Sequence, residues 1–176
     1  MKKAVILHAW YSNPTTNWYS WLKAELEKRG YLVWVPELPT MESNNPQMEE
    51  MLGLITERGF VDEETVVIGH SLGSVLAMRL AERIQFNKGI LLASWDFNDL
   101  TPEHQSFWQT MIDHDMAKKN VRDWVFLISE NDPYVTKAIA HEVAGRFGGV
   151  AVDVGARGHF GKKDGITEVS EILDYI

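Results

Sequence analysis

Short apolar runs alternate with amphipathic segments along most of the chain. Six runs are nearly continuous in apolar residues and rich in β-branched ones: 4–7, 32–35, 66–68, 90–92, 124–128 and 150–154. Runs of this length and composition are typical of strands buried on both faces of a sheet. We therefore expect six buried β-strands.

Apolar residues recur at helical spacing between these runs. The five sets are Trp18, Trp21, Leu22 and Leu26; Met48, Met51, Leu52 and Ile55; Leu72, Val75, Leu76 and Leu80; Ala138, Ile139 and Val143; and Ile166, Val169 and Leu173. Each set marks one buried helix face. Strand–helix alternation predicts a parallel sheet with helices on both faces, and right-handed crossovers make it a doubly wound α/β fold. We expect one domain over residues 1–176.

The segment from Asp96 to Arg122 breaks this rhythm. It begins where a strand end should lead directly into a crossover helix, and it is rich in aromatic residues. A short lid-like insertion and a long crossover helix both fit the pattern. We favour the helix.

Composition narrows the functional classes. The formal net charge is −8, which gives no general attraction for nucleic acid or an anionic membrane. The small basic cluster Lys118, Lys119 and Arg122 fits a solvated face. The absence of cysteine excludes disulfides, thiolate metal sites and a cysteine nucleophile. The apolar start of the chain is interpreted as a first strand and not as a signal peptide. We expect a cytoplasmic protein that needs no metal or cofactor and does not bind membranes.

Polar residues follow several of the expected strands, at the edge of an α/β sheet where ligands bind. The third strand is followed by GHSLG, the fifth by SENDP and the last by GARGHFG. This arrangement places Ser71, Asp132 and His159 on one rim, in the chain order Ser, Asp, His. That order, together with G-x-S-x-G between a strand and a helix, is typical of the α/β-hydrolases.

The spacing of GHSLG has a physical purpose in a nucleophile elbow. The serine lies on a strained turn that projects its hydroxyl above the sheet, and Gly69 and Gly73 allow the backbone and the next helix to approach closely. The free N–H groups at the start of that helix can stabilise an oxyanion. We expect the N–H of Leu72 to be one donor and the N–H of Trp10 to be the second.

The acid of this set has competing interpretations. Asp132 could simply initiate a turn with Pro133. Its position after a strand, between the serine and a histidine, favours a catalytic role instead. Glu130 is its nearest rival, and Asp153 fits the interior of the last strand.

Six histidines compete for the role of general base, and His159 is favoured because it lies in a glycine-rich loop after the last strand. His70 should point away from the site and be structural. His8 should close the first strand and order the oxyanion loop. The other three are His104, His114 and His141, which fit no metal motif. By triad logic His159 takes the proton of Ser71, and Asp132 fixes the imidazole tautomer.

Four segments together carry a resemblance to a known family: LHAWYSNPTTNWYSWLKAELEKRGY, VVIGHSLGS, SENDPYV and GARGHFG. They resemble the small serine hydrolases of the retinoblastoma-binding-protein-nine and bacterial YdeN type, compact α/β-hydrolases that lack the first strands of the full-size fold. The resemblance covers nearly the whole chain and implies the same triad. Ala9 departs from the family, where a His-Gly pair is more usual. Its methyl group bears on the second oxyanion donor more than on the triad.

Two other functional classes remain open. A glycine-rich turn before a helix also binds phosphate, but GHSLGS matches neither nucleotide-binding motif. A catalytically silent hydrolase fold used as a binding module is the other alternative.

Aromatic residues near the rim indicate a small apolar pocket for an acyl substrate. They are Trp10, Trp95, Phe97, Phe107 and Trp108, and the alternative is that they are core residues beneath the helices. Arg157 is expected to be the only nearby cation. We expect a shallow pocket for uncharged acyl esters of roughly two to six carbons, since the gain of about 0.8 kcal/mol per methylene stops when the pocket is full.

Overall fold

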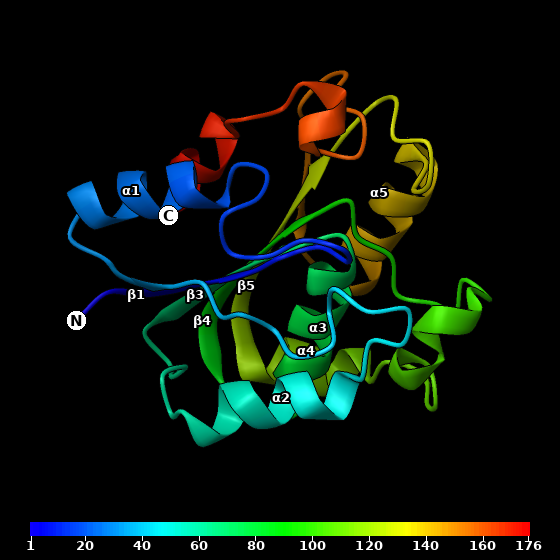
Figure 1. The fold of residues 1–176 in the computed structure, drawn as a ribbon, viewed down its shortest axis with the longest axis horizontal. Helices are drawn as coiled ribbons and strands as arrows, with labels where there is room; N and C mark the ends of the chain where they lie inside the picture. Colours follow the sequence, from blue (N-terminus) through cyan, green and yellow to red (C-terminus); the bar gives the residue numbers. More distant parts are fainter.

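Six parallel strands form a single sheet in this computed structural model, which describes residues 1–176. The strands are β1 (Lys3–Leu7), β2 (Leu32–Trp34), β3 (Thr65–His70), β4 (Phe86–Leu92), β5 (Val121–Ile128) and β6 (Val150–Asp153). Their order is β2-β1-β3-β4-β5-β6 (Figure 1). All six expected strands are confirmed. β2 is added on one side of β1, and β3 to β6 are added on the other side, so the strand order reverses between β1 and β3. Ligands of open α/β sheets bind beyond the carboxyl ends of the strands at such a point.

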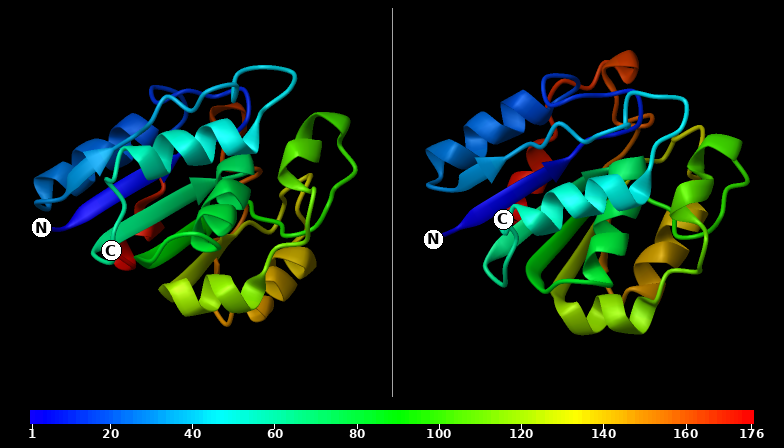
Figure 2. Two further views of the ribbon diagram at one scale, coloured as in Figure 1. Left: turned by 90° about the horizontal axis from the view of Figure 1, so that it is seen from below. Right: turned by 60° about the horizontal axis from the view of Figure 1, so that its bottom comes forward.

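Helices cover both faces of the sheet (Figures 1 and 2). One face carries α2 (Met48–Glu57), α3 (Leu72–Ala81), α4 (His114–Asn120) and α5 (Lys137–Arg146), and the other carries α1 (Tyr19–Lys28). The alternation of side chains along β1 shows why: Val5 and Leu7 pack in the first layer, and Ala4 and Ile6 pack in the second. The doubly wound α/β class is therefore confirmed. None of the helices combines the length and the apolar character needed to cross a bilayer.

The expectation of an α-helix at the end of the chain is wrong. Residues 166–169 are irregular, and the chain then forms a 3₁₀-helix, η3 (Ser170–Asp174). Val169 and Ile172 are nevertheless fully buried against the α1 face of the sheet. Ile166 and Leu173 of the predicted set are only partly buried, so the helical spacing indicated the buried side of this segment and not its backbone conformation.

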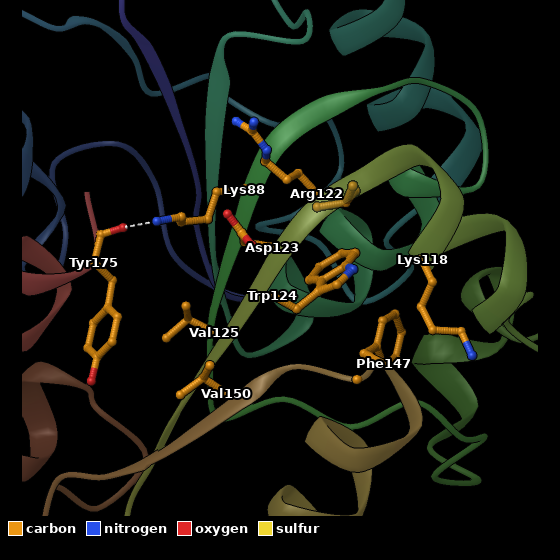
Figure 3. A pocket seen from close by; sticks show the side chains of 11 residues that line it. Lys88, Lys118, Arg122, Asp123, Trp124, Val125, Phe147, Val150 and Tyr175 are labelled. Carbon is orange, nitrogen blue, oxygen red and sulfur yellow. Dashed lines mark hydrogen bonds between the residues drawn. The ribbon is translucent and has the colours of Figure 1, made fainter.

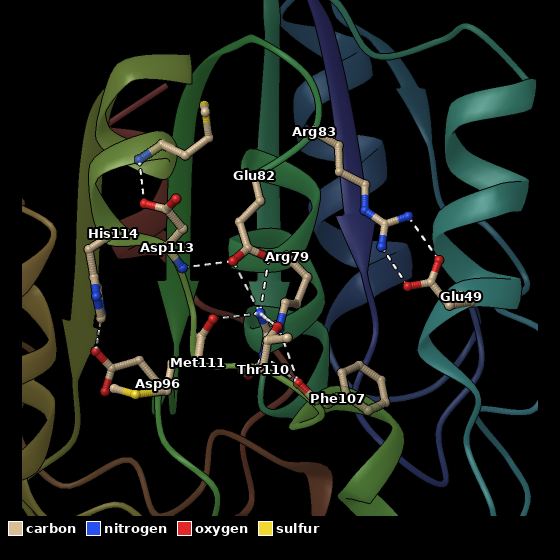
Figure 4. A network of polar contacts seen from close by, with 11 residues as sticks. Glu49, Arg79, Glu82, Arg83, Asp96, Phe107, Thr110, Met111, Asp113 and His114 are labelled. Atoms are coloured by element: carbon tan, nitrogen blue, oxygen red, sulfur yellow. Dashed lines mark hydrogen bonds and ion pairs between the residues drawn. The ribbon is translucent and has the colours of Figure 1, made fainter.

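The segment after β4 is not a long crossover helix either, so that expectation is also wrong. It contains a loop, the 3₁₀-helix η1 (Pro102–Phe107) and the seven-residue α4. The buried Arg79 of α3 donates hydrogen bonds to the backbone carbonyls of Phe107, Thr110 and Met111 (Figure 4). A helix through these residues would use their carbonyls internally.

A second buried charge ties the start of this segment to the body of the protein. Asp96 accepts hydrogen bonds from Arg146 Nε at 2.7 Å and from His114 Nε2 at 2.7 Å (Figure 4 draws the His114 contact). Burial alone would raise the pKa of Asp96, but these hydrogen bonds outweigh burial and lower it. The segment is thus anchored through Asp96 near its start and through Arg79 near its middle.

Candidate active site

Ser71 lies on a strained turn between β3 and α3. Its backbone has φ 55° and ψ −123°, a conformation that is costly for a residue with a Cβ. Gly69 and Gly73 must be glycines because there is no space for a Cβ atom at either position. A Cβ at Gly69 would lie 2.6 Å from Ser74 Cα, and one at Gly73 would lie 2.2 Å from the carbonyl oxygen of Leu7. The sequence GHSLG therefore forms the expected elbow.

The structure brings Ser71, His159 and Asp132 together from three separate loops. His159 Nε2 lies 2.7 Å from Ser71 Oγ, and His159 Nδ1 lies 3.0 and 2.9 Å from the two carboxylate oxygens of Asp132. A carboxylate only accepts, so Nδ1 donates to Asp132 and Nε2 is free to accept the serine proton. The Asp132 side chain is 2% exposed and that of His159 is 20% exposed. This geometry suits removal of a proton from Ser71 by His159.

The Asp132 carboxylate both stabilises a turn and contacts His159, the two roles that the sequence left open. Its Oδ1 accepts the backbone N–H groups of Tyr134 and Val135 at 2.9 and 3.0 Å, as in an Asx turn. The same carboxylate also orients His159. The rival Glu130 is exposed, and no hydrogen bond joins its side chain to a histidine.

The two backbone N–H groups that the sequence predicts as oxyanion donors have no hydrogen-bond partner within the protein. Leu72 is the first residue of α3, so its N–H has no partner within the helix. Trp10 uses its indole Nε1 to donate to the carbonyl of Ser43 at 2.9 Å, and its backbone N–H has no partner within the chain. The N–H of Ala9 is already committed to Tyr19 Oη at 3.0 Å.

Both histidines expected to have structural roles are buried and neutral. His8 accepts the N–H of Leu38 and contacts the carbonyl of Ala9, which ties the loop after β1 to the loop after β2. His70 lies 2.7 Å from Tyr19 Oη and 2.8 Å from the carbonyl oxygen of His159. Burial lowers the pKa of both rings, that of His70 to about 3. The expectation that His70 points away from the site is wrong, because His70 lines the cavity beside Ser71. The sequence gave no signal for its contact with His159.

A cavity of about 990 Å³ opens beside Ser71. Three of the expected aromatics line it: Trp10, Trp95 and Phe97. Phe107 and Trp108 do not line it, because they are buried in the core beneath the segment that Arg79 holds. Further lining residues that the sequence did not single out are Tyr11, Tyr134, Val135 and Ile139. The volume is near the upper end for a ligand pocket, so the site is larger than expected.

The expectation about nearby cations is wrong. Arg157 is paired with Glu171 and does not line the cavity. Lys162 and Lys163 line it instead, together with Asp164, in the short 3₁₀-helix η2 (Lys162–Asp164) that follows His159. This 3₁₀-helix is held near the start of the chain, because the N–H of Lys162 donates to Asn17 Oδ1 at 2.8 Å. Both lysines follow the GARGHFG motif in the sequence, and no sequence pattern predicted that they line the cavity.

A second hollow, of about 490 Å³, lies at the opposite end of β4 and β5 (Figure 3). Trp124, Phe147 and Val150 form its apolar part, and Lys118 and Arg122 extend away from Trp124 in this view. A ligand site needs polar groups that converge. In this hollow the Lys88 ammonium group already donates to the backbone carbonyl of Tyr175 at 2.6 Å (Figure 3), and none of the residues of the elbow line it.

The parallel sheet, the strained serine and the hydrogen-bonded Ser71, His159 and Asp132 define the class of α/β-hydrolase-fold proteins. The comparisons with known proteins go one step further. A family model described as Serine hydrolase matches residues 4–176. The chain belongs to this serine hydrolase family, and hydrolase activity is the function that its family supports.

Individual relatives agree with this assignment. The chain is 25% identical to a Bacillus subtilis protein assigned as a hydrolase, YdeN, over 99% of this chain and 94% of that protein. It is 27% identical to the Rattus norvegicus serine hydrolase RBBP9, over 83% of this chain and 79% of that protein. The crystal structure of the B. subtilis ydeN gene product superposes with a TM-score of 0.89 at 23% identity, covering 99% and 96% of the two chains. A ferulic-acid complex of Est1E from Butyrivibrio proteoclasticus superposes with a TM-score of 0.76 at 11% identity, covering 99% and 89%. The structural likenesses establish the α/β-hydrolase fold.

Proposed function

We propose that this protein hydrolyses small, uncharged acyl esters through a covalent intermediate on Ser71. The observation that carries the proposal is the 2.7 Å contact between Ser71 Oγ and His159 Nε2, with Asp132 on the far side of the ring. Such an arrangement lets a neutral imidazole accept the serine proton as the serine attacks.

The proposed reaction has two halves. In the first, Ser71 Oγ bonds to the acyl carbon, its proton moves to His159, and the tetrahedral oxyanion is stabilised by the N–H groups of Leu72 and Trp10. The alcohol then leaves with the proton from His159. In the second, water attacks the acyl-enzyme, His159 accepts its proton, and the acid is released as the proton returns to Ser71. Asp132 stabilises the imidazolium in both halves.

The cavity lining supports the substrate class. Trp10, Trp95, Val135 and Ile139 give apolar surface beside the serine. The volume of about 990 Å³ has room for an acyl group of roughly two to six carbons together with its alcohol. Neither lysine at the edge is buried, so we propose no requirement for a charged substrate.

An ester series with one common alcohol and acyl chains of graded length tests this proposal. We expect kcat/KM to rise as methylenes fill the pocket and then to fall when the chain exceeds it. A continued rise to long chains, or activity only on charged esters, would contradict the substrate class. No hydrolysis of any ester, amide or thioester would instead favour the alternative of a silent binding module.

A further inference from the structure

The two loops that carry the proposed base and oxyanion donor are joined by a pair of buried side chains. Trp10 belongs to the loop after β1, and His159 belongs to the loop after β6. Tyr19, the first residue of α1, and His70, the last residue of β3, lie between them. Tyr19 is fully buried and His70 is 2% exposed, so water does not compete for their hydrogen bonds.

The donors around the Tyr19 hydroxyl fix the position of its proton. The N–H of Ala9 donates to Tyr19 Oη at 3.0 Å, and Asn17 Nδ2 donates to it at 3.1 Å. The orientation of the Asn17 amide is set, because its Oδ1 accepts the N–H of Lys162. Both lone pairs of the hydroxyl are therefore occupied. Its own proton must point to the third partner, His70 Nδ1, at 2.7 Å.

This direction determines the tautomer of His70. Because Nδ1 accepts, the ring proton is on Nε2, which donates to the carbonyl oxygen of His159 at 2.8 Å. On its other side, the backbone N–H of His159 donates to Asp164 Oδ2 at 3.0 Å. Side chains therefore hold both backbone groups of the proposed base. The ring of His159 has only Asp132 and Ser71 as hydrogen-bond partners, so its placement depends on this backbone.

We propose that His70 is a positioning residue that sets His159 against Ser71 through the main-chain carbonyl of His159, and that Tyr19 holds His70 in the tautomer this requires. The Tyr19 hydroxyl also accepts the N–H of Ala9, so the N–H of Trp10 is left as the oxyanion donor of the loop after β1. The inference rests on the proposed triad. A base misplaced by about 1 Å can cost on the order of 100-fold in rate.

Two substitutions of His70 separate its contact with Tyr19 from its contact with the carbonyl of His159. In His70→Gln, the side-chain amide N–H can reach the position of Nε2 and still donate to the carbonyl of His159. In His70→Asn, the shorter side chain can accept from Tyr19 but cannot reach His159. His141→Asn is the matched control, since His141 is exposed on α5 and its partner is Asp153.

The measurements are kcat and KM on a short acyl ester and the rate of labelling by a fluorophosphonate probe, which reacts with an activated serine. Labelling to completion also counts the folded active sites, so all rates refer to folded enzyme. We expect His70→Asn to lower kcat and the labelling rate together by roughly 10- to 100-fold with KM nearly unchanged. His70→Gln should recover most of this loss, and His141→Asn should match the wild type.

The results distinguish failure of this inference from failure of the proposed function. A wild-type protein that neither labels nor hydrolyses esters contradicts the triad itself. A wild type that labels, with His70→Asn labelling at the same rate per folded site, overturns the role of His70 alone. Equal losses in His70→Asn and His70→Gln would also overturn it, because the carbonyl contact would then not be the cause. If neither variant folds, Tyr19→Phe provides the test, and an unchanged labelling rate there contradicts the inference.

Discussion

The two ends of the sheet differ in how their polar groups are arranged. At the carboxyl end, the strained Ser71 contacts His159, and His159 contacts the buried Asp132. At the amino end, Lys118 and Arg122 line the hollow beside Trp124, and both side chains extend away from the Trp124 ring (Figure 3). Both ends have a cavity and aromatic walls. The comparison teaches that convergence of polar groups and backbone strain, more than a cavity, mark the candidate active site.

The largest expected effect comes from removing the nucleophile at the carboxyl end. Ser71→Ala should lower kcat by about four powers of ten or more, since the alanine methyl fits the elbow but cannot be acylated. Steady-state hydrolysis of a short ester measures this, and circular dichroism checks the fold. Turnover near the wild-type value would show that the two ends do not differ in the way proposed.

A smaller but still large effect is expected for the acid. Asp132→Asn should lower kcat by roughly three to four powers of ten, because an amide favours the wrong imidazole tautomer. Glu130→Gln is the matched control, since Glu130 is exposed two residues earlier and should change kcat little. If the two variants gave the reverse result, the role of the acid would pass to Glu130.

Buried neutral histidines also make the carboxyl end sensitive to acid. The pKa of His70 is lowered to about 3 by burial, while an unfolded histidine titrates at its ordinary value. As the pH falls below about 6.5 the unfolded state binds a proton that the folded state does not, so stability is fully present above this pH and declines towards pH 3. His8, whose pKa is also lowered by burial, acts in the same direction.

Urea unfolding at pH 7.5 and pH 5 measures this effect. The contribution of His70 should be about 2 kcal/mol, from 1.5 pH units at 1.36 kcal/mol each. His70→Gln should have a correspondingly smaller pH dependence than the wild type. The same dependence in both proteins would show that His70 is not held neutral.

The smallest effects are expected at the amino end. Arg122→Ala and Lys118→Ala should leave kcat and KM unchanged and alter stability by no more than about 0.5 kcal/mol, since both side chains are exposed. Kinetics and urea unfolding test this. A loss of activity in either variant would mean that the hollow beside Trp124 contributes to function.

What the sequence predicted well was local. The six strands are short runs of mostly apolar residues, and the elbow is the five-residue motif GHSLG. Ser71, Asp132 and His159 could be brought together because each follows a strand of one parallel sheet.

What the sequence did not predict depends on contacts between distant residues. Arg79 fixes the segment around Phe107 by hydrogen bonds to carbonyls, and no periodicity encodes that role. Tyr19 belongs to none of the predicted helix faces, yet its buried hydroxyl joins Ala9 to His70. Val169 belongs to a set with helical spacing, yet it lies just before the 3₁₀-helix η3. The spacing indicated that Val169 is buried but not the backbone conformation around it.

The central claim is that Ser71 is an activated nucleophile, and covalent labelling tests it most directly. A fluorophosphonate probe incubated with the wild-type protein should add one probe mass, and peptide mapping should locate it on Ser71. Ser71→Ala should remain unlabelled, and Asp132→Asn should label far more slowly. Absence of labelling in the folded wild type, or a probe attached to another residue, would contradict the account.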